Sequence, residues 1–558
     1  MKISNTLGGL LTIFIIFLIL PFLYFYFLNS TKLFFLTNPS IMYLLIIITG
    51  LSLAFYTDIS IKNIEKDSKN TIFMTAVTLV VLYALVLFIL TITRFYSYVS
   101  QAVDIFFFHQ VVWQFAEFKL PYIWQLSQPL YPQWSQHFSP ILMFLAPIYW
   151  VYPNAVMLMI TQALAAITGA IPIYLIARNY LKSRFIGIAL SFAYLVFSGL
   201  QYGFDYGFHE IMFFPVLFLW SYYFYLKKNT KLYIFFIILS LFVKEEVAFI
   251  VFFWGLYLLI FRRDKIWGSV TTALGIFWYI VCFDFVFPTF NQGQGFGYWG
   301  QYQMKGGTGL FGIAMAAFSN PIQFLQSLVT PDDKIKMMLE TFGQFAFLFL
   351  LFPPSLIIIF PSLMEKLLST GIAMSSGAHY SAAITAAVVV ATLEALPHIY
   401  KYKFVNKFVH YKNAFFAVLI FYIAYSSSVF YGYIGFTPIN LFQQNPFENG
   451  LTPDNSIILN QILSNLNTLP KNTTVSTQAQ ILPHIPFYYK RLSSWPGMTG
   501  TEDLVIVDTQ IYPVGANIIQ DEAEYSNDLL RLSKNKNYQP IVAQSGIYVF
   551  RKKIIQYR

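Results

Sequence analysis

Residues 71–93 read TIFMTAVTLVVLYALVLFILTIT, and this stretch decides the fold of the chain. It contains no charged side chain, and a helix of roughly 20 apolar residues is long enough to cross the hydrocarbon core of a bilayer. The whole chain has the same character, since 57% of its 558 residues are hydrophobic and only 11% are charged. This composition excludes a soluble globular protein and predicts a polytopic membrane protein that is all-α in its membrane part.

Further apolar runs of similar length lie on both sides of this stretch. A tight hairpin of two shorter apolar segments, 232–243 and 247–261, interrupts the series. Counting the runs predicts about 11 or 13 crossings of the bilayer. The other candidate spans are residues 7–28, 40–57, 155–177, 185–203, 211–226, 266–287, 341–360, 380–396 and 414–435.

Two segments leave the number of crossings open. A crossing at residues 139–152 would place the basic residues at 178–184 on the wrong side, so we expect an interfacial or re-entrant helix there. Residues 341–360 contain Pro353 and Pro354, and a crossing there would likewise place basic residues on the wrong side. Either this segment re-enters the membrane or residues 309–330 also cross it.

The basic residues predict the orientation of the chain. They cluster in alternating short loops, whereas the loops between them hold few, and basic loops stay on the cytoplasmic side of a membrane. We therefore expect a multi-pass protein of the cell membrane with a cytoplasmic amino terminus and an extracytoplasmic carboxyl-terminal domain. The net charge of +10 arises in these loops and does not indicate nucleic-acid binding. The clusters are Lys62, Lys66 and Lys69; Arg178, Lys182 and Arg184; Lys227, Lys228 and Lys231; Arg262, Arg263 and Lys265; and Lys401, Lys403, Lys407 and Lys412.

Three parts are expected along the chain. Residues 1–70 form an amino-terminal addition of two membrane helices, and residues 71–435 form the transmembrane core, with an outer loop at 94–153. Residues 436–558 are less apolar and predict a small α/β domain outside the membrane. Its expected elements are helices near 455–467 and 519–533, strands at 473–477 and 504–508, and a closing hairpin, PIVAQ–SG–IYVFRK, that turns at Ser545-Gly546.

Ionisable residues gather on the predicted outer side. Such groups are costly at membrane depth unless they pair or line a wet cavity, so they indicate function. The outer set comprises His109, His137, His209, His379, Asp104, Asp205, Glu210, Lys244, Glu245 and Glu246.

The triplet Lys244-Glu245-Glu246 lies at the tip of the short hairpin. Residues 232–243 span only about 18 Å as a helix, so this tip cannot lie far outside the hydrocarbon core. Its charges are therefore expected to face a protein cavity. The alternative is a self-neutralising Lys–Glu pair that fixes the hairpin.

Asp104 and the pair His209-Glu210 allow several interpretations. Asp104 is a candidate general base, because a carboxylate within hydrogen-bond reach can take a proton from an acceptor hydroxyl. It also suits the cap that begins a helix. His209 and Glu210 fit a base with its orienting acid, a metal ligand or an interfacial cap. The aromatic residues of the outer loop fit a membrane-interface belt or a surface for stacking on sugars, namely Trp113, Trp124, Tyr131 and Trp134.

Five motifs in this order resemble an uncharacterised family of prokaryotic membrane proteins over roughly residues 90–510. They are VDIFFFHQVVWQF (103–115), QHFSPILMFLAPIYWVYP (136–153), FHE (208–210), KEE (244–246) and GAHYSAAI (377–384).

That family is similar to the GT-C superfamily of integral-membrane glycosyltransferases. These enzymes take a sugar from a polyprenyl-phosphate carrier at the outer leaflet and use an acid in the first outer loop of their core. Asp104 occupies the matching place. The GT-C pattern usually has two acids close together there, whereas here Asp104 stands alone and Glu117 is the only other acid nearby.

The resemblance predicts a glycosyltransferase with Asp104 as general base or metal ligand. Lys244 and Arg94 are expected to hold the carrier phosphate, since charge develops on that leaving group. The residues expected to bind the sugar or orient the other groups are His109, His137, His209, Glu210, Glu245, His379 and Tyr380.

The expected partners are the bilayer and a polyprenyl-phosphate-linked sugar, with no nucleic acid. No cofactor is predicted, and a divalent metal stays open. Two other functions remain alternatives. One is a transporter or flippase for a lipid-linked or small polar solute, and the other is a non-catalytic scaffold or sensor that works through the outer domain.

Overall fold

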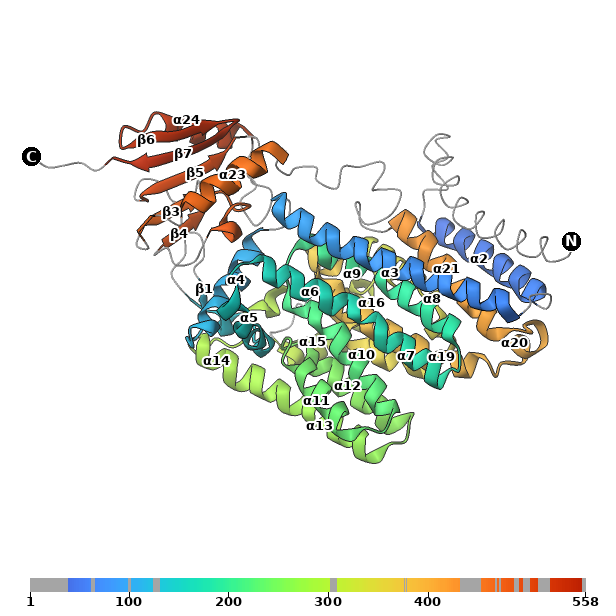
Figure 1. Cartoon of the computed structure of the whole chain (residues 1–558). Coiled ribbons are helices and arrows are strands. Elements are labelled where there is room, and N and C mark those ends of the chain that lie inside the picture. The colour runs from blue at the N-terminus through green and yellow to red at the C-terminus, as the bar shows by residue number, and fades with distance from the viewer. Residues whose placement is uncertain are drawn as a thin grey trace, which may run out of the picture. The chain divides into compact units, whose positions relative to one another are not determined.

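The computed structural model is mainly helical, with one small mixed sheet near the carboxyl terminus (Figure 1). It describes residues 39–61, 66–98, 102–123, 131–301, 309–375, 377, 379–431, 453–466, 469–470, 473–485, 491–494, 502–509 and 522–553. The predicted span 7–28 and Trp124 lie outside these residues. The chain divides into two compact units, Met1–Leu87, Leu164–Phe204 and Glu210–Gln444 in the first and Phe88–Ala163, Asp205–His209 and Asn445–Arg558 in the second. The units follow contacts rather than chain order, so the division into 1–70, 71–435 and 436–558 stays a prediction.

The first unit is a bundle of helices, several of which are broken by short 3-10 or π segments. Its helices are α2 (Pro39–Ile61), α3 (Lys66–Tyr96, whose last turns belong to the second unit), α7 (Ala170–Tyr180), α8 (Arg184–Leu195), α9 (Ser198–Tyr206), η4 (Glu210–Phe213), α10 (Phe214–Leu226), α11 (Thr230–Leu241), α12 (Val247–Ile260), α13 (Lys265–Ile280), the π-helix η5 (Val281–Val286), α14 (Phe287–Phe290), η6 (Gly297–Gln301), α15 (Gly309–Ser319), α16 (Pro321–Ser327), α17 (Asp333–Gly343), η7 (Leu348–Leu351), η8 (Pro353–Ser355), α18 (Leu356–Leu368), η9 (Gly371–Met374), η10 (His379–Ser381), α19 (Ala382–Ile399), α20 (Lys403–Phe408) and α21 (Lys412–Tyr431).

Five of the described helices are long and apolar enough to cross a membrane. A sixth span, Arg184–Leu195 with Ser198–Phe204, is bent by 47° at its break. The apolar stretch of α3 has a mean hydropathy of 2.7, yet only 6% of it is buried within the protein. So much exposed apolar surface needs lipid around it, which confirms the membrane class. The five are Phe73–Tyr96, Val156–Tyr180, Lys265–Phe290, His379–Ile399 and Lys412–Val429.

The ambiguous segments are short or broken helices. Residues 139–152 form η3 (Pro140–Leu145) and α5 (Ala146–Val151), and the tight hairpin forms α11 and α12. Segment 341–360 is interrupted by 3-10 turns around its proline pair, and 309–330 is divided into α15 and α16. None of these is a continuous span among the described residues. The count of about 11 or 13 crossings stays a prediction.

Close helix contacts in the first unit depend on glycine. A Cβ atom on Gly255 of α12 would lie 2.3 Å from the backbone nitrogen of Thr272 in α13, and one on Gly275 would lie 2.6 Å from that of Phe252. Such distances are impossible without moving a helix. These glycines let the two backbones pack against each other, as small residues do in membrane bundles.

A buried carboxylate joins three helices at the end of the bundle that bears basic loops. Glu394 of α19 is 3% exposed, and its oxygens accept hydrogen bonds from Tyr222 of α10 at 2.6 Å and Tyr257 of α12 at 2.7 Å. Arg262 donates to it at 2.5 Å. Every oxygen of this carboxylate is paired, so it serves as a structural link between the helices.

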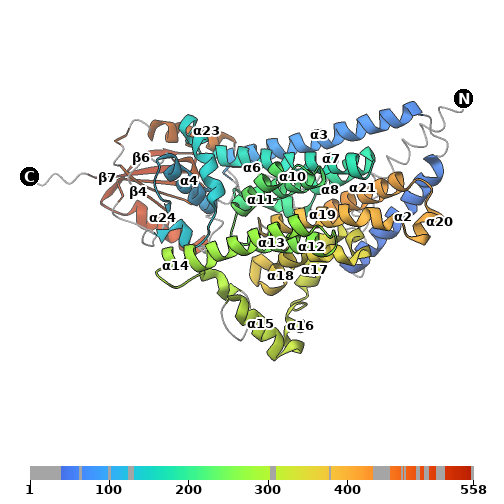
Figure 2. The same ribbon diagram turned by 90° about the horizontal axis from the view of Figure 1, so that it is seen from below.

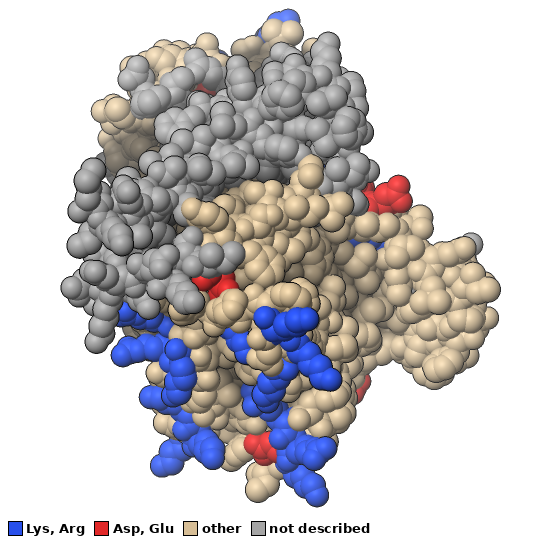
Figure 3. Space-filling view, turned by 90° about the vertical axis from the view of Figure 1, so that its right-hand side faces the viewer, with Lys and Arg blue, Asp and Glu red and all other residues tan. Residues whose placement is uncertain are grey.

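Basic residues are exposed in the loops that the sequence predicts to be cytoplasmic. Figure 3 shows Lys and Arg side chains gathered on one face, which agrees with a sided membrane protein. The orientation of the termini stays a prediction. Exposed basic residues in these loops include Arg178, Lys182, Lys227, Lys228, Lys231, Arg262, Arg263, Lys265, Lys401, Lys403 and Lys407.

The second unit combines helices of the predicted outer loop with the carboxyl-terminal α/β domain. Besides the end of α3, it contains α4 (Ala102–Ala116), β1 (Tyr122–Ile123), β2 (Tyr131–Pro132), η2 (Gln133–Ser135), η3, α5, α6 (Val156–Thr168), α23 (Pro453–Leu466), β3 (Thr474–Thr477), η11 (Leu482–His484), β4 (Arg491–Ser494), β5 (Leu504–Asp508), α24 (Glu522–Ser533), β6 (Tyr538–Gln544) and β7 (Ile547–Lys552).

The sheet of this unit has the order β4-β3-β5-β7-β6. Strand β3 pairs in parallel with β4 and β5, and β7 runs antiparallel to β5 and β6. The predicted helices, strands and hairpin of the domain are confirmed, and β4 is an additional strand. The turn uses Ser545 and Gly546 at φ values of 50° and 82°, the left-handed values that a tight hairpin needs.

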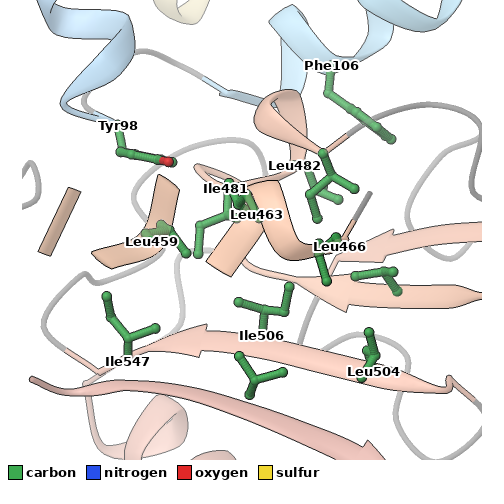
Figure 4. Close-up of a cluster of buried hydrophobic side chains, with 13 residues drawn as sticks. Tyr98, Phe106, Leu459, Leu463, Leu466, Ile481, Leu482, Leu504, Ile506 and Ile547 are labelled. Atoms are coloured by element: carbon green, nitrogen blue, oxygen red, sulfur yellow. The ribbon is translucent and has the colours of Figure 1, made fainter. Parts of the chain in front are cut away.

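Alternate residues of β5 face two different cores. Val505 and Val507 pack with Leu532 of α24. Leu504 and Ile506 face the other way, toward α23 and η11 (Figure 4). This alternation is the period of two expected of a strand buried on both faces.

The core beneath α23 also contains two residues from the outer-loop region. Tyr98 and Phe106 are each 1% exposed and belong to the same cluster as Leu459 and Ile547 (Figure 4). The Tyr98 hydroxyl donates to Asn460 Oδ1 at 2.8 Å. The carboxyl-terminal domain therefore shares its core with the start of α4.

Histidines add to this junction. The ring of His484 lies 4.3 Å from that of Phe95 and 4.1 Å from that of Tyr98, measured between centroids. His109 is buried on α4, and its Nδ1 lies 2.7 Å from the Tyr149 hydroxyl. Burial lowers the pKa of both histidines to about 3, and mutual repulsion adds to the effect at His109.

The second unit should therefore lose stability in mild acid. Between pH 6.5 and 3 the unfolded histidines bind protons and the folded ones do not, so the free energy of unfolding falls as pH falls. Each histidine contributes about 1.4 kcal/mol per pH unit in this window, and nothing above pH 6.5. Thermal unfolding of the detergent-solubilised chain at pH 7, 6 and 5 measures the slope. The double variant His109→Gln/His484→Phe should flatten it, and an unchanged slope would contradict the assignment.

Candidate functional site

Asp104 lies in the first turn of α4, which begins at Ala102. The position is thus inside the helix and not at the cap that the sequence left as an alternative. A negative side chain in a first turn is favoured by the helix dipole. The Asp104 side chain is 30% exposed, so its carboxylate is open to a ligand as well as to its protein neighbour.

That neighbour is His209, more than 100 residues later in the chain. The Nε2 atom of His209 lies 3.5 Å from Oδ2 of Asp104. The histidine side chain is only 7% exposed, whereas the carboxylate is the accessible member of the pair. The structure therefore pairs His209 with Asp104, where the sequence had suggested its neighbour Glu210 as one possible partner.

A glutamine from a membrane span holds the segment that carries His209. The fully buried Gln162 of α6 accepts a hydrogen bond from the His209 backbone N–H at 2.6 Å and donates to the Gly207 carbonyl at 2.7 Å. Gly207 has a φ of 111°, which favours glycine. Phe108 packs edge-on against the imidazole with ring centroids 5.5 Å apart. The pair is thus positioned by buried, well-bonded groups.

Gln162 was missed by the sequence analysis, although a signal was present. A primary amide inside an apolar span is costly unless it bonds within the protein, so it marks a polar contact. Its partner could not be identified from the sequence, because both of its bonds go to backbone atoms of a remote loop.

Lys244 belongs to a second cluster, in the first unit. Its Nζ lies 3.4 Å from Glu246 Oε2, and the side chains of the two residues are 7% and 21% exposed. The carboxylates of Glu210 and Glu245 also interact with its charge. The hairpin tip thus contains a Lys–Glu pair, which is the alternative that the sequence analysis gave to a charge facing a cavity.

Two further charged residues, from α18, belong to this second cluster. Glu365 interacts electrostatically with Glu246, Lys244 and Lys366. The buried Lys366 donates to the backbone carbonyl of Ser375 at 2.6 Å. The cluster therefore holds four carboxylates and two ammonium groups from three remote segments. Glu365 and Lys366 were not singled out from the sequence, because the span prediction ended at residue 360.

The remaining predicted site residues occupy different environments. Arg94 is buried in the last turn of α3, and His137 is half-buried after η2. His109 bonds to Tyr149 inside the second unit, which favours a structural role. His379 is buried in the first unit, and its ring lies 4.1 Å from that of Tyr380. Their contribution to a binding site stays a prediction.

The partly exposed Asp104 carboxylate beside the His209 imidazole suits proton transfer. A carboxylate can accept a proton from a hydroxyl, and the neighbouring histidine can orient it through a hydrogen bond. Among the described residues, no three His, Cys, Asp or Glu side chains are arranged to share a metal ion.

Replacing Lys244 tests whether the hairpin tip depends on its charge. Lys244→Met leaves several carboxylates without their cation and should destabilise the protein by about 3–5 kcal/mol, the usual effect of breaking a buried ion pair. The double variant Lys244→Met/Glu246→Gln should recover part of this loss. Thermal unfolding in detergent compares the three proteins. A single variant as stable as the unchanged chain would show that the pair has no structural role.

Comparison with known proteins gives one family. Residues 94–549 match the model of the family described as "Predicted membrane protein (DUF2079)". No curated protein matches the chain. Two crystal structures of ArnT from Cupriavidus metallidurans, one bound to undecaprenyl phosphate and one in the apo state, are similar to it. Each has a TM-score of 0.43 and 10% sequence identity, and covers 85% of this chain and 98% of its own.

The family match extends over both units and includes every predicted site residue. Since it covers well over half of the chain, it confirms the resemblance found in the five motifs. The chain belongs to the DUF2079 family of predicted membrane proteins.

Proposed function

We propose that this protein is a membrane glycosyltransferase that moves a sugar from a polyprenyl-phosphate carrier to an acceptor at the outer membrane face. The observation that carries the proposal is the Asp104–His209 pair, an accessible carboxylate 3.5 Å from a buried imidazole. Asp104 also stands in the first outer loop of the core, where the resemblance to GT-C enzymes predicts the catalytic acid.

In this mechanism Asp104 acts as general base. Its carboxylate takes the proton from an acceptor hydroxyl as the oxygen attacks the anomeric carbon of the donor sugar. His209 donates a hydrogen bond to the carboxylate and fixes its orientation. The bond from the anomeric carbon to the carrier phosphate breaks, and the phosphate leaves with the electron pair.

The leaving phosphate needs positive charge near it. Arg94 is the first candidate, because a guanidinium can bind two phosphate oxygens at once. Lys244 is the second, although its charge is already shared with Glu246. Contacts to the sugar are proposed for His137, Glu210, Glu245, His379 and Tyr380.

A transporter or flippase is the second candidate, and one feature favours it. Transporters often use discontinuous helices at their substrate sites. The span made of α8 and α9 is broken between Leu195 and Ser198 and bent by 47°. A transporter would move solute through the protein without breaking a glycosidic bond.

Asp104→Asn should abolish transfer while the protein stays folded. Asparagine keeps the shape of the side chain but cannot act as a base, so the rate should fall by about 10²–10⁴-fold. The measurement is sugar transfer from a lipid-linked donor by the purified protein in nanodiscs. Glu117→Gln is the matched control, because Glu117 is another outer-loop acid, is 51% exposed and interacts only weakly with Lys119 at 3.9 Å.

Two outcomes would contradict this proposal. Asp104→Asn protein with unchanged transfer would remove the general base. Movement of intact solute into proteoliposomes, with no glycosidic bond broken, would favour the transporter instead.

A further inference from the structure

The span Lys265–Phe290 contains a π-helix, η5, near its end. A π turn inserts an extra residue into an α-helix and occurs frequently at functional sites. Here it carries Asp284, whose side chain is exposed, and Asp284 lies close enough to Tyr279 to interact with it electrostatically. A carboxylate in a membrane span indicates function unless it serves only structure.

Aromatic rings pack together around this turn. We call Tyr279, Phe283, Phe287, Phe296 and Trp299 the aromatic platform. The ring of Phe283 lies 4.7 Å from Tyr279, 5.3 Å from Phe287, 5.3 Å from Phe296 and 5.5 Å from Trp299, between centroids. All except the buried Phe287 remain partly exposed. Figure 2 shows α14 at the end of α13, and the chain segment that carries Phe296 and Trp299 follows α14.

A loop rich in glycine and amides, residues 291–301, brings the last two rings to the platform. Asn291 Nδ2 donates to the Gly295 carbonyl at 2.7 Å and closes the loop. Gly293 and Gly295 have φ values of 84° and 72°, which explains why these positions are glycine. The exposed Gln292 and Gln294 add uncharged hydrogen-bonding groups.

The φ values that explain glycine at positions 293 and 295 do not explain glycine at positions 297 and 300. Their φ values are not in the left-handed region, and a Cβ atom on either would meet nothing within 4 Å. Neither packing nor backbone geometry requires glycine there. Glycine is also used where a ligand must come close to the backbone.

The chemistry of this region selects one class of ligand. Between Asp284 and Lys305 the sequence has no charged residue, so the aromatic platform and its described loop, residues 279–301, contain no cation of their own to bind a phosphate. The negative faces of aromatic rings attract the weakly positive C–H faces of a pyranose ring. Carboxylate and amide groups then bind its hydroxyls.

We propose that the aromatic platform, with Asp284 and the 291–301 loop, binds a pyranose ring of a neutral carbohydrate. This is a binding site in the first unit, beyond the proposed transfer at Asp104, and it needs no catalytic activity. The other use of such aromatic residues is anchoring at the membrane interface. The sugar-binding site and the membrane anchor differ in whether a sugar can contact the Trp299 ring.

The experiment measures binding to the full chain in nanodiscs of zwitterionic lipid. Saturation-transfer NMR uses three neutral probes, the methyl pyranosides of glucose, galactose and mannose, and sorbitol serves as an open-chain control. At least one pyranoside should give a saturable signal and sorbitol none. Trp299→Ala should weaken binding about tenfold, the effect of losing one ring stack, and Trp299→Phe should keep most of it. Trp150→Ala, which removes an exposed tryptophan of the second unit, should change nothing.

Gly300→Val separates binding from folding. Because nothing lies within 4 Å of an added Cβ, the unfolding temperature should stay the same while binding falls several-fold. No saturable signal from any of the three pyranosides would overturn the proposal, as would full binding by both Gly300→Val and Trp299→Ala. Quenching of Trp299 emission by brominated lipid, with no response to the sugars, would assign the platform to membrane anchoring. Asp104→Asn should leave this binding intact, so failure here is distinguishable from failure of the proposed transfer.

Discussion

Lipid replaces water as the solvent around the membrane-spanning helices, and the rest of the structure depends on that constraint. Helix α3 exposes nearly all of its apolar surface, and a polar group placed there would lose its hydrogen bonds to water. Many charged residues of the described chain therefore lie in exposed loops or pair inside the protein, and Asp284, exposed on a π turn within a span, is an exception. Glu394 bonds to Arg262 and two tyrosines, and Lys244 pairs with Glu246. Asp104 differs, because its partner His209 leaves the carboxylate partly accessible.

The accessible pair depends on residues that are far apart in the chain. Asp104 is held by α4, whose Phe106 belongs to the same core as the carboxyl-terminal helix α23. His209 is held by Gln162 of a membrane span. The carboxyl-terminal domain thus contributes to the position of α4. This is a structural role for the domain.

Local patterns in the sequence predicted much of the fold. Long apolar runs predicted the five long spans and the bent pair α8–α9 of the described residues. The pattern of turns and apolar residues predicted the helices and most strands of the α/β domain. Strand β4, with the sequence RLSS, has one apolar residue, Leu492, and no β-branched or aromatic residue, so the sequence did not mark it as a strand and it was missed. The candidate site residues were partly predictable, because ionisable groups near membrane spans are costly and therefore indicate function. The pairing of Asp104 with His209 was not predictable, because it arises from tertiary packing through Gln162 and Phe108. The periodicity of a sequence reports only local structure.

The proposed transfer requires Asp104 and His209 to face the reacting sugar. A cryo-electron microscopy structure of the protein in nanodiscs with a non-transferable lipid-linked donor analogue tests it most directly. We expect the anomeric carbon to lie beside the Asp104 carboxylate, with room between them for an acceptor hydroxyl and with the His209 contact preserved. A donor sugar bound well away from Asp104 would contradict it.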